Sequence, residues 1–290
     1  MNPKSTSLFR EPYHLNEMRM FGRQFYWLII ILLLFISCED KKTEEPPDNQ
    51  AKIIFQFDHT IDQLPILFDS LMYENAAGNP YLVNEIQYFI SDVKLYHQNG
   101  KVKLIDDWKA IHYVDSDIES TMTWEVYDPV DPGVYDSVSF TFGISEERNF
   151  SFMYVNPPEK DMFWPEFLGG GYHYLKLNGK WLPEGQAIQT APFDFHLGIG
   201  QIYYSYPDSI TGFIHNYFNV SLSPSGFTLD PGETKHLKII MQVEKWFMEP
   251  HLYDHDVYGG YIMQSQDAMQ NVMENGFNVF VFKGSTKNKN

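Results

Sequence analysis

Short runs in which apolar and polar residues alternate recur along most of this chain. They are rich in β-branched and aromatic residues, and turn segments such as HQNGK, LNGKW and DPGET separate them. A period of two is typical of β-strands with one buried face, and frequent turn residues favour antiparallel connections between them. The runs therefore predict an all-β chain, and they cover residues 52–59, 85–96, 102–107, 110–115, 135–144, 172–179, 192–199, 215–223, 236–243 and 277–284.

One segment near the C-terminus has helical periodicity instead. Residues 266–273 place Ala268, Met269 and Val272 on one face, and Gly276 follows as a stop signal. The 290 residues, 43% of them hydrophobic, are enough for a large core. We therefore predict one antiparallel β-sandwich domain over residues 51–284, with long loops, one short helix near the C-terminus and a disordered tail at 285–290.

The N-terminal segment has the layout of an export signal. Two arginines, Arg19 and Arg23, precede an apolar run at residues 25–36. This run is too short for a membrane span and is soon followed by acidic residues. Residues 1–37 are therefore predicted to be a lipoprotein signal peptide, with Met18 or Met20 as alternative starts.

Cys38, the only cysteine, has a specific role in this interpretation. Residues 35–38, FISC, resemble a bacterial lipobox, in which cleavage leaves an acylated N-terminal cysteine. The next residues, EDKKTEEPPDNQ, are charged and proline-broken, so residues 38–50 are predicted to be the acylated cysteine and a disordered tether. We expect a lipid anchor in a Gram-negative outer membrane, on its periplasmic face or at the cell surface.

Net charge limits the partners of the exported chain. Without the four basic and two acidic residues of the leader, it carries 17 Lys and Arg against 36 Asp and Glu. This balance argues against nucleic acid, because phosphate binding needs basic surface. An acidic surface serves solubility and is also compatible with cations. Because no cysteine follows Cys38, a bound metal would need histidine, carboxylate, thioether or a modified side chain.

Two histidines lie where predicted strands end. His59 closes the run FQFDH and His196 lies in FDFHLGIG, so each could be delivered to a rim of the sandwich. Imidazole suits Cu(II), sulfur suits Cu(I), and no thiolate competes in the exported domain. His59 and His196 are therefore candidate copper ligands, although the sequence leaves open whether they converge.

His251 and His255, in PHLYDHDVYGG, are candidates for a second metal site. Their spacing would place both rings on one face of a helix. Pro250 and the pair Gly259–Gly260 bracket the segment and favour a loop instead. The alternative is a loop gathered beneath Tyr253 and Tyr258.

No familiar catalytic pattern is present in the sequence. The glycines at 169–171 do not join a strand to a helix as in a phosphate-binding loop, and no serine nucleophile elbow occurs. Carboxylates are numerous, but none has a context that would separate an acid from a base. The chain is therefore predicted not to be an enzyme.

Five blocks of sequence carry a family resemblance. They are YFISDV at 88–93, GVYDSVSFTFGI at 133–144, MFW at 162–164, GY at 171–172 and FHLG at 195–198. In this order they resemble the MbnP-like domain, named after a periplasmic copper-binding protein encoded beside methanobactin genes. The resemblance extends from about residue 53 to residue 282.

This resemblance implies a β-rich exported domain that binds copper. Relatives use histidine and a tryptophan that a dihaem partner enzyme oxidises to kynurenine. Trp164 matches the tryptophan after methionine, His196 the histidine of His-Leu-Gly, and His59 a histidine at the end of the first strand. Kynurenine presents an amine and a carbonyl where indole has only an N–H donor. Copper is therefore the expected cofactor, with His59, His196, Trp164 and Met162 as its expected site.

The chain departs from the family pattern around its tryptophan. Glu166 stands where relatives commonly have a second tryptophan, and Pro165 is unusual. About two extra residues lie within LGGG at 168–171. These differences bear on the oxidation of Trp164 rather than on the fold.

Two functions remain open from the sequence. The first is a copper-binding lipoprotein that acts as a carrier or scavenger. The alternative is an extracytoplasmic recognition domain that binds a glycan or a protein through exposed aromatic loops, without metal. The loops in question are residues 162–167, 202–209 and 246–261.

Overall fold

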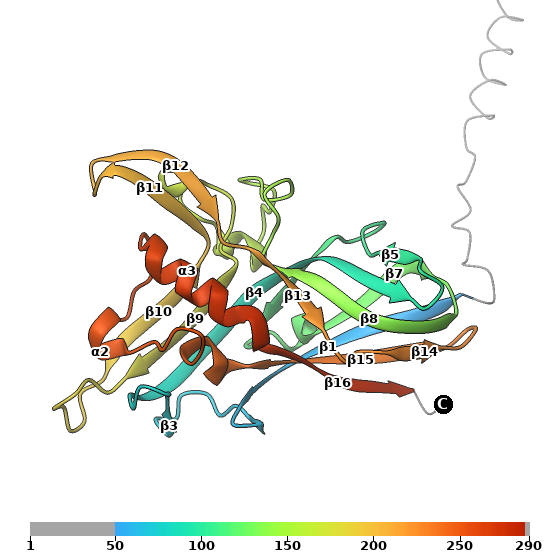
Figure 1. Ribbon diagram of the computed structural model, residues 1–290, viewed down its shortest axis with the longest axis horizontal. Helices are drawn as coiled ribbons and strands as arrows, with labels where there is room; N and C mark the ends of the chain where they lie inside the picture. Colours follow the sequence, from blue (N-terminus) through green and yellow to red (C-terminus); the bar gives the residue numbers. More distant parts are fainter. Residues whose placement is uncertain (1–49, 288–290) are drawn as a thin grey trace, which may run out of the picture. The chain divides into compact units, whose positions relative to one another are not determined.

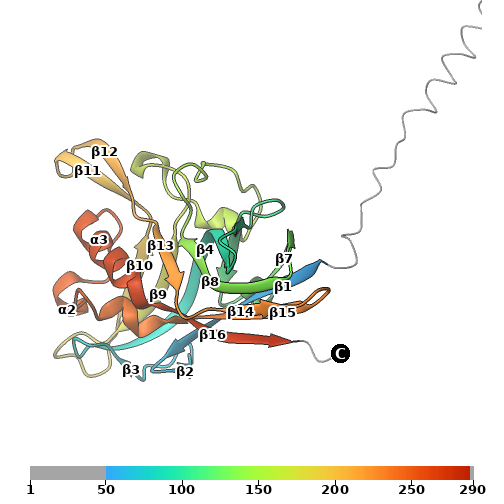
Figure 2. The same ribbon diagram turned by 45° about the vertical axis from the view of Figure 1, so that its right-hand side comes forward.

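The computed structural model describes residues 50–287, which form two sheets packed face to face (Figures 1 and 2). The predicted signal peptide, Cys38 and almost all of the tether lie outside the described residues. No helix within residues 50–287 is long and apolar enough to cross a membrane.

The smaller sheet contains both the first and the last strand of the domain. Its strands follow the order β16-β15-β1-β2, with β7 paired to β1. The strands are β1 (Ala51–Ile61), β2 (Leu64–Pro65), β7 (Thr123–Val130), β15 (Thr234–Gln242) and β16 (Phe280–Lys287).

The larger sheet has nine strands and the main order β10-β9-β4-β8-β13, with the other four at its margins. The strands are β3 (Tyr73–Glu74), β4 (Pro80–His97), β5 (Val102–Leu104), β6 (Ile111–Asp115), β8 (Gly133–Phe142), β9 (Leu175–Trp181), β10 (Ala191–Leu197), β13 (Phe218–Leu222) and β14 (Phe227–Leu229).

A hairpin stands apart from both sheets. Its strands, β11 (Ile199–Ser205) and β12 (Ser209–His215), pair only with each other and project beyond the sandwich in Figure 1. Below it lie the helices α2 (His255–Tyr258) and α3 (Gln266–Asn275). Short 3-10 helices complete the secondary structure: η1 (Glu119–Met122), η2 (Glu159–Met162), η3 (Glu166–Leu168), η4 (Val243–Phe247) and η5 (Gly276–Asn278).

The core between the sheets is largely aromatic. Phe280 of β16 meets Phe140 of β8 edge-on at 5.3 Å between ring centroids, and it also contacts Tyr88 of β4 at 6.1 Å. Aromatic pairs at these separations add to the gain from burying their surface. Alternation in β1 supplies the facing side chains, because Phe55 and Phe57 are buried while the intervening Gln56 is only partly buried.

The predicted all-β sandwich is confirmed, and so is the short helix near the C-terminus, which is α3. Most pairings are antiparallel, but β1 and β15 run parallel, with Phe55 opposite Leu237. Alternation alone did not indicate this, because it gives no strand direction. Strand β16 continues to Lys287, beyond the expected domain end at residue 284.

Candidate metal centre

The segment that contains Trp164 folds back on itself and buries the indole. The backbone N–H of Trp164 donates to the carbonyl of Gly171 at 2.8 Å, and Phe163 forms an isolated β-bridge with Tyr172. Gly171 has a φ of 77°, and a Cβ there would lie 2.6 Å from Asn149 Oδ1, so the turn requires glycine. Trp164 is completely buried, and its Nε1–H donates to the carbonyl of Leu168 at 3.1 Å.

Three rings form a contiguous cluster at this turn. Trp164 contacts the imidazole of His173 with ring centroids 4.6 Å apart and planes at 68°. His173 in turn meets His196 with centroids 5.0 Å apart and planes at 90°. The expected residues Trp164 and His196 are therefore joined through His173, which lies in the predicted strand at 172–179 and is not among the ligands expected from the sequence.

Hydrogen bonds fix which nitrogen of each imidazole carries the proton. The Nδ1 of His173 lies 2.9 Å from the carbonyl oxygen of Met162, which can only accept, so Nδ1–H donates. The Nε2 of His196 lies 2.8 Å from Oδ1 of Asn178, whose Nδ2 donates to Glu85 at 3.0 Å. His196 Nε2–H therefore donates as well, and lone pairs remain on Nε2 of His173 and Nδ1 of His196. Metal-binding histidines are typically held this way by a partner on the opposite nitrogen.

Both imidazoles are neutral at physiological pH. Burial lowers the pKa of His173 well below its usual value, and the nearby His196 and Lys176 lower it further. Burial and the charge of Lys176 lower the pKa of His196 to about 4. Neutral imidazole is the form that binds metal, so no proton has to leave before an ion is bound.

Lys176 lies beside the histidine pair on the same face of the sheet. It is directly opposite His196 in the β9–β10 register, and its Nζ donates to the carbonyl of Asp161 at 2.5 Å. Burial lowers the pKa of Lys176, whereas the carboxylates of Glu85, Asp161 and Asp115 raise it.

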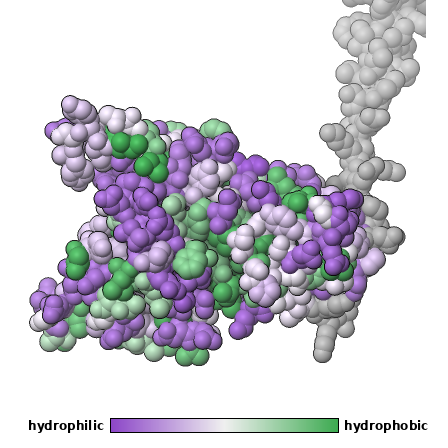
Figure 3. Space-filling view, viewed as in Figure 1, coloured by the Kyte–Doolittle hydropathy of each residue, from purple (hydrophilic) through white to green (hydrophobic). Residues whose placement is uncertain are grey.

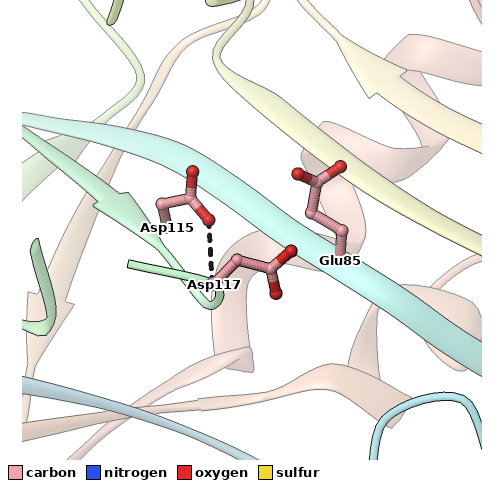
Figure 4. A group of neighbouring side chains, drawn as sticks. All are labelled: Glu85, Asp115 and Asp117. Atoms are coloured by element: carbon pink, nitrogen blue, oxygen red, sulfur yellow. Dashed lines mark hydrogen bonds between the residues drawn. The ribbon is translucent and has the colours of Figure 1, made fainter. Parts of the chain in front are cut away.

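Three carboxylates group together further along this face (Figure 4). Ligand oxygens of Glu85, Asp115 and Asp117 lie within 4.8 Å of one another. Asp115 already accepts hydrogen bonds from Tyr113 Oη at 2.7 Å, Gln87 Nε2 at 3.0 Å and the backbone N–H of Asp117 at 2.9 Å. Hydrogen bonds within the protein therefore account for the position of Asp115 in this group. Glu85 connects the group to His196 through Asn178.

Strand register places His59 on the other side of the larger sheet. Tyr88, Leu175 and Leu197 form one row across β4, β9 and β10, and Lys176 and His196 belong to the next row. Adjacent rows point to opposite faces. Since the ring of His59 contacts Tyr88 at 5.7 Å between centroids, His59 lies between the sheets and does not converge with His196.

His59 has its own buried surroundings. Its Nε2 has no hydrogen-bond partner among the described residues, and burial lowers the pKa of this imidazole to about 4. The residue lines a cavity of about 300 Å³ together with Thr60, Ser116 and Met122.

Met162 reaches the histidine pair through its backbone. Its carbonyl accepts both Nδ1–H and the backbone N–H of His173, at 2.9 and 2.7 Å. Its side chain is completely buried. The carbonyl of Met162 therefore orients the imidazole of His173.

The two histidines of the second candidate site have separate surroundings. His251 Nε2 pairs with the carboxylate of Glu274 on α3. His255 is buried and stacks on Phe193 at 4.8 Å and on Trp181 at 5.3 Å between ring centroids. The aromatic contacts match the alternative interpretation of a packed loop.

The aromatic loops are only partly exposed. Trp164 and Trp246 are completely buried, so neither can act as an exposed stacking platform. Tyr206 and Tyr261, from two different loops, are exposed and line a common pocket.

Comparison with known proteins agrees with the sequence blocks. A family model described as MbnP matches residues 50–270. The chain belongs to the MbnP family. The solved structure of MbnP from Methylosinus trichosporium is similar to this chain, with 14% identity over 71% of this chain and 79% of that one, and a TM-score of 0.46. No curated protein matches this chain.

Family membership confirms the resemblance drawn from the five sequence blocks. The MbnP family is associated with methanobactin and copper and is extracytoplasmic. Trp164 and His196, the two residues that matched family positions within the MFW and FHLG blocks, both belong to the ring cluster.

Proposed function

We propose that this chain is an exported copper-binding protein, a carrier or scavenger rather than an enzyme, and that His173 and His196 hold the ion. One observation carries the proposal: two adjacent neutral imidazoles each have one nitrogen fixed as a donor to the protein. Their other nitrogens, Nε2 of His173 and Nδ1 of His196, keep their lone pairs.

The donor set favours copper over other first-row metals. Copper heads the affinity order for nitrogen ligands, and imidazole suits both copper and zinc. Zinc sites usually add a thiolate or carboxylate as a further protein ligand. Within residues 50–287 no carboxylate is hydrogen-bonded to either imidazole, since Met162 and Asn178 provide their partners through amide carbonyl oxygens.

Trp164 would complete the site after oxidation by a dihaem partner enzyme. Its indole N–H is already bonded to the carbonyl of Leu168, and indole has no lone pair to offer a metal. Kynurenine would supply an aromatic amine and a carbonyl next to His173. Glu166 and Pro165 leave the burial of Trp164 intact, because the indole is completely buried with both residues present.

Cys38 would anchor the domain in the outer membrane of a Gram-negative cell, as the lipobox-like sequence indicates. The acidic residues after it would extend the chain from the membrane. Such a location suits a protein that captures or transfers copper in the cell envelope.

Titration of the purified protein with Cu(I) and Cu(II), in competition with a chelator, tests this function. Replacing His173 or His196 by alanine should weaken binding at least as much as the roughly 10- to 100-fold loss typical of an outer-sphere change. His59→Ala and the surface variant His251→Ala should bind like the wild type. Equal affinity for all five proteins would refute the site.

A further inference from the structure

A second pocket lies between the projecting hairpin and the start of α3. Its volume is about 440 Å³, which is within the range of small-ligand sites. In Figure 1 the β11–β12 hairpin arches over the helices, and in Figure 3 the surface is indented below this hairpin. The lining residues are Gln201, Tyr203, Tyr206, Tyr261, Met263, Gln264, Ser265, Gln266 and Asp267.

Three tyrosines give the pocket aromatic walls. Tyr203 and Tyr206 meet at 78° with ring centroids 5.0 Å apart, so their faces point in different directions. Tyr206 is 69% exposed and Tyr261 is 60% exposed. Tyrosine combines a flat apolar face with a hydroxyl that bonds to polar ligands. Exposed rings that line one hollow are suited to stacking on a flat ligand.

Gln201 lines the pocket and carries a buried polar atom that has no hydrogen-bond partner among residues 50–287. The residue is only 3% exposed, and its Nε2 donates to the carbonyls of Leu168 at 2.8 Å and Ile199 at 2.5 Å. These two bonds fix the amide, and its Oε1 accepts no hydrogen bond within the described residues. A buried acceptor without a donor costs about 1 to 3 kcal/mol. Because Oε1 is itself shielded from solvent, a ligand in the pocket does not reach it in this conformation.

The start of α3 adds further unsatisfied groups. Ser265 is the N-cap of this ten-residue helix, but its side chain makes no capping hydrogen bond. The first-turn N–H groups can therefore donate to a ligand oxygen. The pocket thus presents hydrogen-bond donors at the helix start.

The charge of the lining argues against an anionic ligand. Asp267 is the only charged residue in the lining, and no lysine or arginine contributes to it. An anion would be repelled by this carboxylate and would lack a cationic partner. An aliphatic ligand would leave the amides and hydroxyls of the lining unpaired, since Met263 is the one aliphatic side chain present.

We propose that this pocket binds a neutral carbohydrate, with a pyranose ring stacked on the exposed ring of Tyr206 or Tyr261 and its oxygens accepting hydrogen bonds from the first-turn N–H groups of α3. The C–H face of a pyranose is flat and apolar, which matches a tyrosine ring, and its rim carries hydroxyls that both donate and accept. A hollow that is already formed before the ligand binds reduces the ordering cost of binding.

The sugar site is separate from the histidine pair, although one atom links them. The carbonyl of Leu168 accepts from both Gln201 Nε2 and Trp164 Nε1. Tyr206 and Tyr261 have no ring contact with His173 or His196 among the contacts described for residues 50–287. Loss of one function therefore leaves the other measurable.

Saturation-transfer NMR and calorimetry with defined oligosaccharides test the proposal. The probes are cellohexaose, maltohexaose, mannohexaose and xylohexaose, with hexagalacturonic acid as an anionic comparison and tetraalanine as a peptide comparison. At least one neutral hexasaccharide should bind to the purified protein. Tyr206→Ala and Tyr261→Ala should each weaken its binding by about tenfold, as expected for loss of one stacking ring.

Tyr204→Ala is the matched control, because Tyr204 belongs to the same hairpin and is 87% exposed but does not line the pocket. Its affinity should equal that of the wild type. The proposal is overturned if no neutral hexasaccharide binds, if hexagalacturonic acid or tetraalanine binds more tightly than all of them, or if Tyr204→Ala weakens binding as much as Tyr206→Ala.

Discussion

The imidazole of His173 meets that of His196 edge-on, with ring centroids 5.0 Å apart and ring planes at 90°. His196 comes from strand β10, whereas His173 precedes β9 and is held by the folded-back segment that carries Trp164. Two separate backbone elements therefore have to pack correctly before both lone pairs are available. Residues that hold the two rings should matter nearly as much as the rings themselves.

Asn178 should control copper affinity without binding copper. Its Oδ1 accepts a hydrogen bond from Nε2–H of His196, which leaves the lone pair on Nδ1 of His196 free. In Asn178→Leu this partner is lost, and the ring can rotate or change tautomer. Copper affinity measured by chelator competition should fall roughly 10- to 100-fold, in line with other outer-sphere changes.

Asn178→Asp is the companion variant, since aspartate retains an oxygen acceptor at the same position. It should keep copper affinity at or above that of the wild type, because the acceptor is retained and a negative charge is added beside His196, although its bond to Glu85 is lost. If the leucine and aspartate variants lose affinity equally, the tautomer argument for His196 fails.

Lys176 should make the site discriminate against divalent ions. Its ammonium lies opposite His196 in the sheet register and acts on both imidazoles. Coulomb energy scales with the product of the charges, so Lys176→Met should raise divalent affinity by about the square of the factor measured for Cu(I). Titrations with Cu(I) and Zn(II) measure both factors.

Lys180→Met is the control for this charge effect. Lys180 lies on the same face of β9 but is exposed, so solvent screens its charge. It should change both affinities by much less than Lys176→Met. Equal factors for Cu(I) and Zn(II) in Lys176→Met would contradict an electrostatic origin.

The sequence predicted much of the fold because alternation reports directly on half-buried strands. The strand predicted at 52–59 corresponds to β1, and the helix predicted at 266–273 corresponds to α3. The β11–β12 hairpin was not predicted, since IYYSYPDS lacks a regular alternation of buried and exposed positions. Alternation therefore predicted strands that pack one face on the core, and it did not predict strands of a hairpin that projects from the core.

The candidate site was harder to predict for two physical reasons. Alternation shows which residues share a face of one strand, but not which face of which sheet they reach, so His59 and His196 could not be assigned to opposite sides of β4 and β9. His173 was missed because its role depends on a long-range fold-back, its bond to Met162, that leaves no local periodicity.

Gly198 should be required for the packing of Trp164. A Cβ at this position would lie 2.5 Å from the indole ring, well inside contact distance. Gly198→Ala should therefore lower the free energy of unfolding by about 1 to 3 kcal/mol, as overpacking of a core typically does. Urea denaturation followed by tryptophan fluorescence measures this change.

Gly212→Ala is the comparison, since its Cβ would come no closer than 3.3 Å, to the flexible end of Ile202. Its effect on the free energy of unfolding should be smaller. A Gly198→Ala protein as stable as wild type would show that the indole can shift, which would also loosen its contact with His173.

His255 should make the domain sensitive to acid. Burial lowers its pKa to about 4, whereas an unfolded histidine has a pKa near 6.5. Between these values the unfolded chain binds more protons, so the stability contributed by the neutral ring is complete above about pH 6.5 and is lost as pH falls toward 4. At pH 5 this loss is on the order of 2 kcal/mol for one residue.

His255→Phe should remove this part of the acid sensitivity. Phenylalanine cannot be protonated and can stack on Phe193 and Trp181 as the imidazole does. The gap in unfolding free energy between pH 7.5 and pH 5 should narrow by roughly 2 kcal/mol relative to wild type. His251→Phe is the control, because His251 is only partly buried and already pairs with Glu274, so replacing it should not narrow this gap. An unchanged pH dependence in His255→Phe would mean that other buried histidines, such as His59, carry the whole effect.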